Sequence, residues 1–332
     1  MSKKNVSGQL LSGENLSRSD IYQDWESDNQ AWWDWYVSLA KNEAPQLMKN
    51  LKIETLKVDK QFWPKIFLEL SEPYTVSARE VAYFQENGFI KIKNVLSGNA
   101  IYALRETLLM LLKESFDNVH KKPSFRSMEL VWLRNKFVKE YVLSQRIAGI
   151  AGQLLKVKRL RLYYDNVLSK EPGCGRTPWH YDAHHFPLRT NNVVTAWIPA
   201  QPIILEMGPL AFATPISTYK LVESISFDKF SVSYDDAISE CFKKNNVDIV
   251  NKPFDLGEIS FHHNLSCHTA GRNNTNVSRV VLANTFYEDG TYIVENPTMV
   301  SGDWKKFFPG LEAGQLAKTD LNPICWERGK NV

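Results

Sequence analysis

The second half of the chain is divided into short segments in which apolar and polar residues tend to alternate, separated by proline and glycine. A period of two puts successive side chains on opposite faces of an extended chain and predicts strands. Many short strands joined by turns are typical of a sandwich or barrel. We therefore expect a mainly β fold from about residue 159 onward, built from RLRLYYDNVLS, NVVTAWIPAQPIIL, GPLAFATP, DLGEISFHH and SRVVLANTFY.

Helical spacing dominates the preceding part of the chain. Ser77 is a capping residue in front of the amphipathic run AREVAYFQENG, and Gly88 is expected to end that helix. The next run, FIKIKNV, alternates apolar and basic residues and predicts a strand. Residues 98–117 and 134–155 again have helical spacing, so we expect helices flanking the β fold.

These changes in pattern suggest one large domain with two additions. We expect residues 1–75 to form an N-terminal helical extension, partly disordered at its start, and residues 76–332 to form the main domain. The aromatic-rich residues 21–41 predict a helix packed on that domain, with a free-standing recognition helix as the alternative. Residues 218–252 are a charged insertion, expected to be partly helical around 234–245.

The charge balance argues against a protein that binds nucleic acid. The 332 residues include 40 Lys and Arg and 37 Asp and Glu, a formal net charge of +3, with the two signs mixed along the chain. No run of about 18 apolar residues could span a membrane, and the polar start does not resemble a secretory signal. The four cysteines, at 174, 241, 267 and 325, form no close pair, so we expect a reduced, cytosolic protein.

Six of the seven histidines fall in two clusters, WHYDAHHF at residues 179–186 and HHNLSCH at residues 262–268. His180 and Asp182 are two residues apart, so on an extended segment both side chains point to the same side. A third ligand from a distant strand, for which we propose His268, would complete a set of two histidines and one carboxylate. Such a set leaves positions open on the metal and suits non-haem Fe(II).

Neighbouring histidines compete for the same roles. His184 and His185 could replace His180, but neither is followed by a carboxylate two residues later. His262 and His263 compete with His268, and we expect one of them to face inward as a packed or supporting group.

A candidate anion-binding residue, Arg279, follows His268 by eleven positions. If the polar stretch between them turns near Asn273 and Asn274, the two residues become near-opposite neighbours on antiparallel strands. The arginine could then reach a small dicarboxylate whose other end binds the metal, because a guanidinium matches a carboxylate with two hydrogen bonds. Arg272 is the alternative anchor, but it lies in the expected turn.

Taken in order, these motifs resemble the phytanoyl-CoA dioxygenase (PhyH-like) family of Fe(II)/2-oxoglutarate-dependent oxygenases. The resemblance extends over most of the chain after residue 76. It rests on the segments SAREVAYFQENGFIKIKNVLS, KEPGCGRTPWHYDAHHFPL, VVTAWIPAQPIILEMGPLAFATP and LGEISFHHNLSCHTAGRNNTNVSRVVL.

The resemblance implies a double-stranded β-helix (jelly-roll) fold with flanking helices. It places the iron on His180, Asp182 and His268, and the distal carboxylate of 2-oxoglutarate against Arg279. It also implies that two further residues line or approach the co-substrate pocket, namely Trp197 and Lys170.

The implied activity is the hydroxylation by O2 of an unactivated C–H bond in a small-molecule or carrier-linked acyl substrate, with succinate and CO2 as co-products. The alternatives are desaturation or cyclisation at the same site, and a non-catalytic jelly-roll that binds a metal or ligand. Asp182 argues against halogenation, because halogenating relatives have a small residue there that makes room for chloride. Four basic residues could border the pocket mouth and favour an anionic substrate, with solvated surface charge as the alternative: Arg176, Arg189, Arg272 and Lys121. The oligomeric state stays open.

Overall fold

The computed structural model describes residues 48–53, 57–117, 124–226, 233–297 and 304–330. The helix predicted over residues 21–41 lies outside these ranges, and so does Lys121. Within the expected N-terminal extension, the described part contains a short 3-10 turn, η2 (Lys60–Phe62), and helix α3 (Trp63–Ser71).

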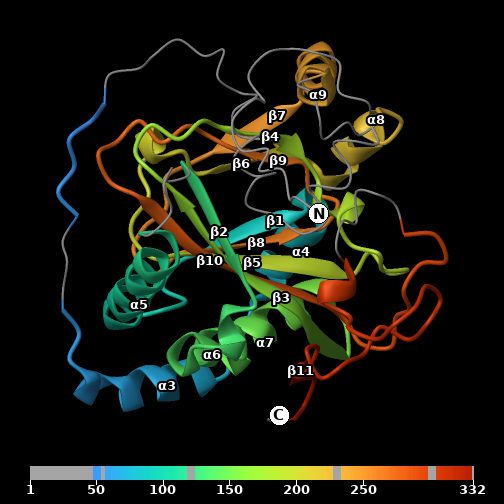
Figure 1. Ribbon diagram of the computed structural model, residues 1–332. Helices are drawn as coiled ribbons and strands as arrows, with labels where there is room; N and C mark the ends of the chain where they lie inside the picture. Colours follow the sequence, from blue (N-terminus) through green and yellow to red (C-terminus); the bar gives the residue numbers. More distant parts are fainter. Residues whose placement is uncertain (1–47, 54–56, 118–123, 227–232, 298–303, 331–332) are drawn as a thin grey trace, which may run out of the picture.

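Two antiparallel sheets form the centre of the molecule, as the alternating segments predicted (Figure 1). The larger sheet has the order β1 (Phe89–Ile92), β8 (Ile259–His263), β5 (Val193–Pro199), β10 (Arg279–Glu288), β3 (Arg159–Lys170) and β11 (Ile324–Glu327), and β2 (Phe125–Glu129) also pairs with β3. The smaller sheet has the order β4 (Thr177–His180), β9 (His268–Ala270), β6 (Leu210–Thr214) and β7 (Asp248–Asn251).

The inner faces of the two sheets pack against each other through a compact apolar cluster. Phe89 of β1 stacks on Phe212 of β6, with ring centroids 4.1 Å apart and planes 9° from parallel. Val281 of β10 and Ala270 of β9 belong to the same buried cluster. Side chains of both sheets therefore meet in one interior layer, which is where a site built from both sheets can form.

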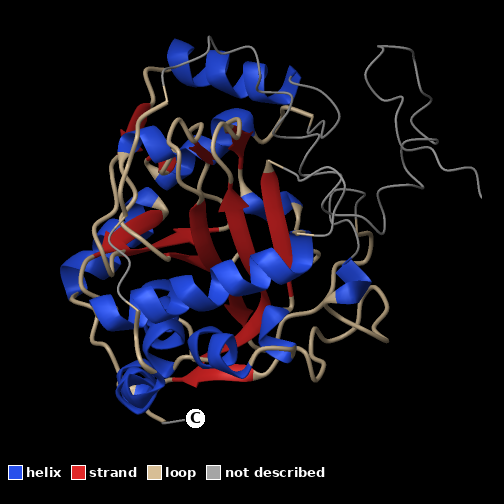
Figure 2. Cartoon of the chain, turned by 60° about the vertical axis from the view of Figure 1, so that its left-hand side comes forward, coloured by secondary structure: helices blue, strands red, loops and turns tan. Residues whose placement is uncertain are grey.

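Helices cover the outer face of the larger sheet (Figures 1 and 2). The main core joins apolar side chains of this face, such as Phe261 and Leu282, to those of the helices, such as Leu104 and Ile150. Besides α3, these helices are α4 (Ala78–Asn87), α5 (Gly98–Phe116), α6 (Lys136–Val142) and α7 (Gln145–Leu155). No helix in the described part of the chain is long and apolar enough to cross a bilayer.

The helix boundaries follow from local capping. Ser77 and Glu80 form a capping box at the start of α4, and Gly88 ends it at φ 75°, as predicted. The helical run predicted over 134–155 is instead two helices. The Ser144 hydroxyl accepts a hydrogen bond from the N–H of Ile147 and donates one to the carbonyl of Leu70, and this cap starts α7 separately.

The charged segment 218–252 packs on the smaller sheet (Figure 1). It contains α8 (Tyr219–Val222), α9 (Ser233–Lys244) and strand β7. Tyr234, Ile238 and Phe242 of α9 are buried in a cluster with Tyr181 and Cys267, which lie within the two histidine motifs. The amphipathic face of α9 thus covers the segments that carry those motifs.

A buried acid ties α9 to strand β4. The carboxylate of Asp235 accepts hydrogen bonds from both terminal nitrogens of Arg176 and from the backbone N–H of Trp179, the last at 2.7 Å. Only 3% of Asp235 is exposed. Trp179 precedes His180 in the same strand, so this contact fixes the backbone next to a candidate metal ligand.

We predict that Asp235→Ala lowers the free energy of unfolding by about 3 kcal/mol, because it removes the acceptor of a mostly buried ion pair and of a backbone N–H. Chemical denaturation measures the change. Asp236→Ala, at an exposed position of the same helical turn, should cost less than about 0.5 kcal/mol. Equal losses in the two variants would contradict this role of Asp235.

Candidate active site

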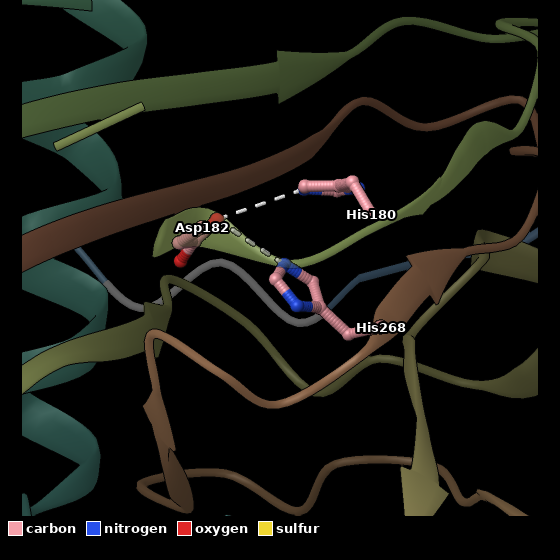
Figure 3. A group of neighbouring side chains, drawn as sticks. All are labelled: His180, Asp182 and His268. Atoms are coloured by element: carbon pink, nitrogen blue, oxygen red, sulfur yellow. Dashed lines mark ion pairs between the residues drawn. The ribbon is translucent and has the colours of Figure 1, made fainter. Parts of the chain in front are cut away.

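His180, Asp182 and His268 converge between the two sheets (Figure 3). Oδ1 of Asp182 lies 3.7 Å from Nε2 of His180 and 3.7 Å from Nε2 of His268. One ligand atom from each residue lies within 4.8 Å of the others. His180 and His268 are register partners on β4 and β9, so the sheet itself brings these two imidazoles together.

The backbone between His180 and Asp182 stays extended and then turns. Tyr181 has φ −132° and ψ 144°, and Asp182 begins the 3-10 turn η4 (Asp182–His184). Alternation along the extended part puts His180 and Asp182 on the same side, as expected. The turn starts where β4 has ended, so the carboxylate sits beyond the edge of the regular strand.

The hydrogen bonds of the two histidines leave Nε2 free to bind a cation. Nδ1 of His180 lies 2.9 Å from the carbonyl oxygen of Pro178, and Nδ1 of His268 lies 2.9 Å from that of Ser266. A carbonyl oxygen can only accept, so Nδ1 carries the proton in each ring. Burial lowers the pKa of both histidines, so both are neutral near pH 7 and each Nε2 presents a lone pair.

Asp182 supplies the negative charge of the site. Burial favours its neutral form, but the neighbouring His268, His262 and His180 more than offset this and lower the pKa of Asp182 below its ordinary value. The carboxylate therefore faces two imidazole lone pairs without a proton between them. Three electron-pair donors that converge in this way are stabilised by a metal cation, and the donor set fits Fe(II).

A cavity of about 100 Å³ connects this centre to Arg279. Trp197 also lines it, and its contact with a co-substrate stays a prediction. Four polar residues that were not predicted from the sequence also line the cavity. They lie on β3, β5 and β10: Tyr164, Asn166, Thr195 and Thr285. Strand alternation could have identified Thr285, because it shares the inward face of β10 with Arg279.

Arg279 is positively charged, and no carboxylate of the described residues lies within 4 Å of its guanidinium nitrogens. Its side chain is 2% exposed, its guanidinium carbon lies 5.3 Å from the ring centroid of Trp197, and one terminal nitrogen donates to the carbonyl of Gly208. Its Nε has no hydrogen-bond partner. Burial lowers the pKa of Arg279 to about 10, so it stays charged at neutral pH. Such a group is a ready site for an anion.

The expected placement of His268 and Arg279 on adjacent antiparallel strands is wrong. β9 belongs to the smaller sheet and β10 to the larger one. The intervening residues 271–278 cross between the sheets, and the Asn273 amide donates to the carbonyls of Lys170 and Val277 to hold that crossing. Arg279 and the metal ligands therefore share the cavity from different sheets, which a period-two pattern does not reveal.

Lys170 lies beside Arg279 in the register of β3 and β10, but it does not line the cavity. Its buried ammonium donates to the carbonyls of Gly175, Ala270 and Gly271 at 2.9–3.2 Å. The side chain thus holds together the loops that flank the site, and its contact with a co-substrate stays a prediction.

The other histidines have separate places. Nε2 of His184 lies 3.3 Å from the hydroxyl of Tyr234, and His184 does not line the cavity. The ring of His263 lies near Phe84 of α4, with centroids 6.3 Å apart. His262 is buried and lines the cavity, so it is the one of the two adjacent histidines that faces inward.

Comparison with known proteins identifies the family. A family model described as phytanoyl-CoA dioxygenase (PhyH) matches residues 84–281. The peroxisomal phytanoyl-CoA dioxygenase of Bos taurus is 22% identical over 264 residues, which are 70% of this chain and 75% of that protein.

Two solved structures share the fold. The non-haem alpha ketoglutarate dependent carbocyclase SnoK from nogalamycin biosynthesis has a TM-score of 0.62 at 22% identity, over 76% of this chain and 99% of its own. The epimerase SnoN, in complex with Fe3+, alpha ketoglutarate and nogalamycin RO, has a TM-score of 0.60 at 20% identity, over 75% and 98%. The double-stranded β-helix expected from the sequence is thereby confirmed. Since the family model spans more than half of the chain, this protein belongs to the phytanoyl-CoA dioxygenase (PhyH) family.

Proposed function

We propose that this protein is a non-haem Fe(II)/2-oxoglutarate-dependent oxygenase that hydroxylates an unactivated C–H bond of a small molecule. The observation that carries the proposal is one cavity with a centre of three electron-pair donors and a buried guanidinium without a carboxylate partner among the described residues. Family membership supports it, and so does the likeness to SnoN, whose structure contains Fe3+ and alpha ketoglutarate.

The proposed roles follow from the charges. His180, Asp182 and His268 would hold the iron, and Arg279 would bind the distal carboxylate of 2-oxoglutarate. Together with O2, the bound iron and co-substrate supply the oxidant for the C–H bond, with succinate and CO2 as co-products. The protein's own residues orient the reactants and exclude water, and the buried walls of the cavity suit that task.

Hydroxylation is our choice among the reactions that such a site can perform. Asp182 occupies the position that a halogenating enzyme needs for chloride, which disfavours halogenation. Desaturation or cyclisation is the second candidate, because SnoK is a carbocyclase. A non-catalytic binding protein would have no need for Arg279 in the same cavity as the metal ligands.

For the substrate, we propose only that it is a small molecule. The anionic or carrier-linked substrate considered from the sequence stays a prediction, and two of its supports are weakened. Arg176 pairs with Asp235 and Arg189 pairs with Glu295, so neither offers a free charge. The cytosolic location likewise stays a prediction.

We predict that Ala at position 180, 182 or 268 abolishes 2-oxoglutarate turnover, because the proposed oxygenase centre needs all three donors that converge here. Anaerobic addition of Fe(II) and 2-oxoglutarate to the wild-type protein should give a weak visible charge-transfer band, which the variants at positions 180 and 268 lack. Asp248→Ala, at an exposed position of β7, is the control. Succinate formation by a metal-replete Asp182→Ala variant would refute the assignment.

We predict that Arg279→Ala raises the KM for 2-oxoglutarate about 100-fold, since hydrogen bonds to a charged group contribute about 1.5–3 kcal/mol each. Assays of succinate formation at varied 2-oxoglutarate concentration measure this. Arg272→Ala tests the alternative anchor and should change the KM by less than about 3-fold. An unchanged KM in Arg279→Ala, or a large increase in Arg272→Ala, would count against Arg279 as the anchor.

A further inference from the structure

We propose that His262 is a positioning residue that orients the Asp182 carboxylate, so that one oxygen faces the metal and the other is kept off it. The inference deepens the proposed function and rests on it. It concerns a third imidazole that lies beside the three candidate ligands and that the ligand set does not include.

The two oxygens of Asp182 have different partners. Oδ1 lies 3.7 Å from Nε2 of both His180 and His268. Oδ2 lies 3.4 Å from Nε2 of His262. One oxygen is therefore directed at the candidate ligands, while the other is directed at a histidine outside that group.

The proton positions separate His262 from the ligand histidines. Nδ1 of His180 and of His268 donates to a backbone carbonyl, which leaves Nε2 as a lone-pair donor. Nδ1 of His262 is buried and has no hydrogen-bond partner. A buried N–H without an acceptor is costly, so a ring proton belongs on Nε2, where it points toward the carboxylate. His262 is thus a donor to Asp182, whereas the other two are suited to bind metal.

The surrounding structure holds the ring of His262 in this place. Its backbone lies in β8, in register with Phe89 of β1 and Thr195 of β5. The ring centroid lies 4.6 Å from that of His268 and 5.8 Å from that of Phe212, and the residue is 3% exposed. A distance of 3.4 Å is longer than the usual 2.7–3.2 Å of an N–H···O hydrogen bond. A small rotation of the carboxylate when metal binds would complete the bond.

This orientation has a chemical consequence. A carboxylate can bind a metal through one oxygen or through both. With Oδ2 bonded to His262, Asp182 takes one position on the ion, and the remaining positions stay available for the co-substrate. A non-polar residue at position 262 would leave Oδ2 unpaired inside the protein, and the carboxylate would no longer be held in the orientation that directs Oδ1 at the metal.

The test compares two side chains of similar size at position 262. His262→Leu removes the N–H donor, and His262→Gln keeps one. We expect His262→Leu to raise the dissociation constant for Fe(II), measured anaerobically by calorimetry, by about 10- to 100-fold. His262→Gln should remain within about 3-fold of wild type, and so should His263→Leu, the matched change at the adjacent histidine outside the cavity. Wild-type affinity in His262→Leu, or an equal loss in His263→Leu, would overturn the inference.

A second measurement does not depend on the folding of any variant. In a crystal structure of the wild-type protein loaded with Co(II), we expect Oδ1 of Asp182 on the metal and Oδ2 within about 3 Å of Nε2 of His262. Binding of the metal through both oxygens would overturn the inference and leave the proposed function intact. A wild-type protein that binds neither Fe(II) nor Co(II) would overturn the proposed function itself.

Discussion

The interior of this protein contains two opposite charges that do not pair with each other. Asp182 is surrounded by imidazoles, and Arg279 has an unpartnered Nε and an aromatic neighbour. Burial of a charge without a compensating partner costs several kcal/mol in a folded protein. The cavity between the sheets is therefore complementary to a cation at one end and an anion at the other. Both proposals above depend on that separation.

Both sheets contribute side chains to this cavity. The smaller sheet presents His180 and His268, and the larger sheet presents Arg279 and His262. Strands hold side chains more rigidly than loops do, which suits a centre whose donors must converge. The stack of Phe89 on Phe212 lies between the same sheets and supports their spacing.

Local signals in the sequence predicted most of the elements but not their arrangement. The capping residues of α4 predicted both of its ends, and strand alternation predicted the main strands. The motif from His180 to Asp182 predicted that these side chains converge, because two residues apart on an extended chain means the same side. By contrast, nothing local shows that residues 271–278 cross from one sheet to the other.

For the same reason, the sequence could not show which of His262 and His263 faces the cavity. Alternation states that adjacent residues face opposite sides, but only the register of β8 against β1 and β5 determines which one faces the cavity. Lys170 differs again, because its ammonium binds the carbonyl of the nearby Gly175 and those of Ala270 and Gly271, about 100 residues away in the chain. Such contacts depend on the whole fold and have no local sequence signature.

The link between α9 and strand β4 bears on how shortened forms of this protein should be interpreted. Excising the charged segment 218–252 would also delete the carboxylate that receives the Trp179 backbone N–H and the Arg176 side chain. If the shortened protein no longer bound iron, the cause would be a β4 strand that is held less firmly, and not the loss of a metal ligand. Restoring a single acidic side chain next to β4 in the shortened protein would distinguish these two explanations.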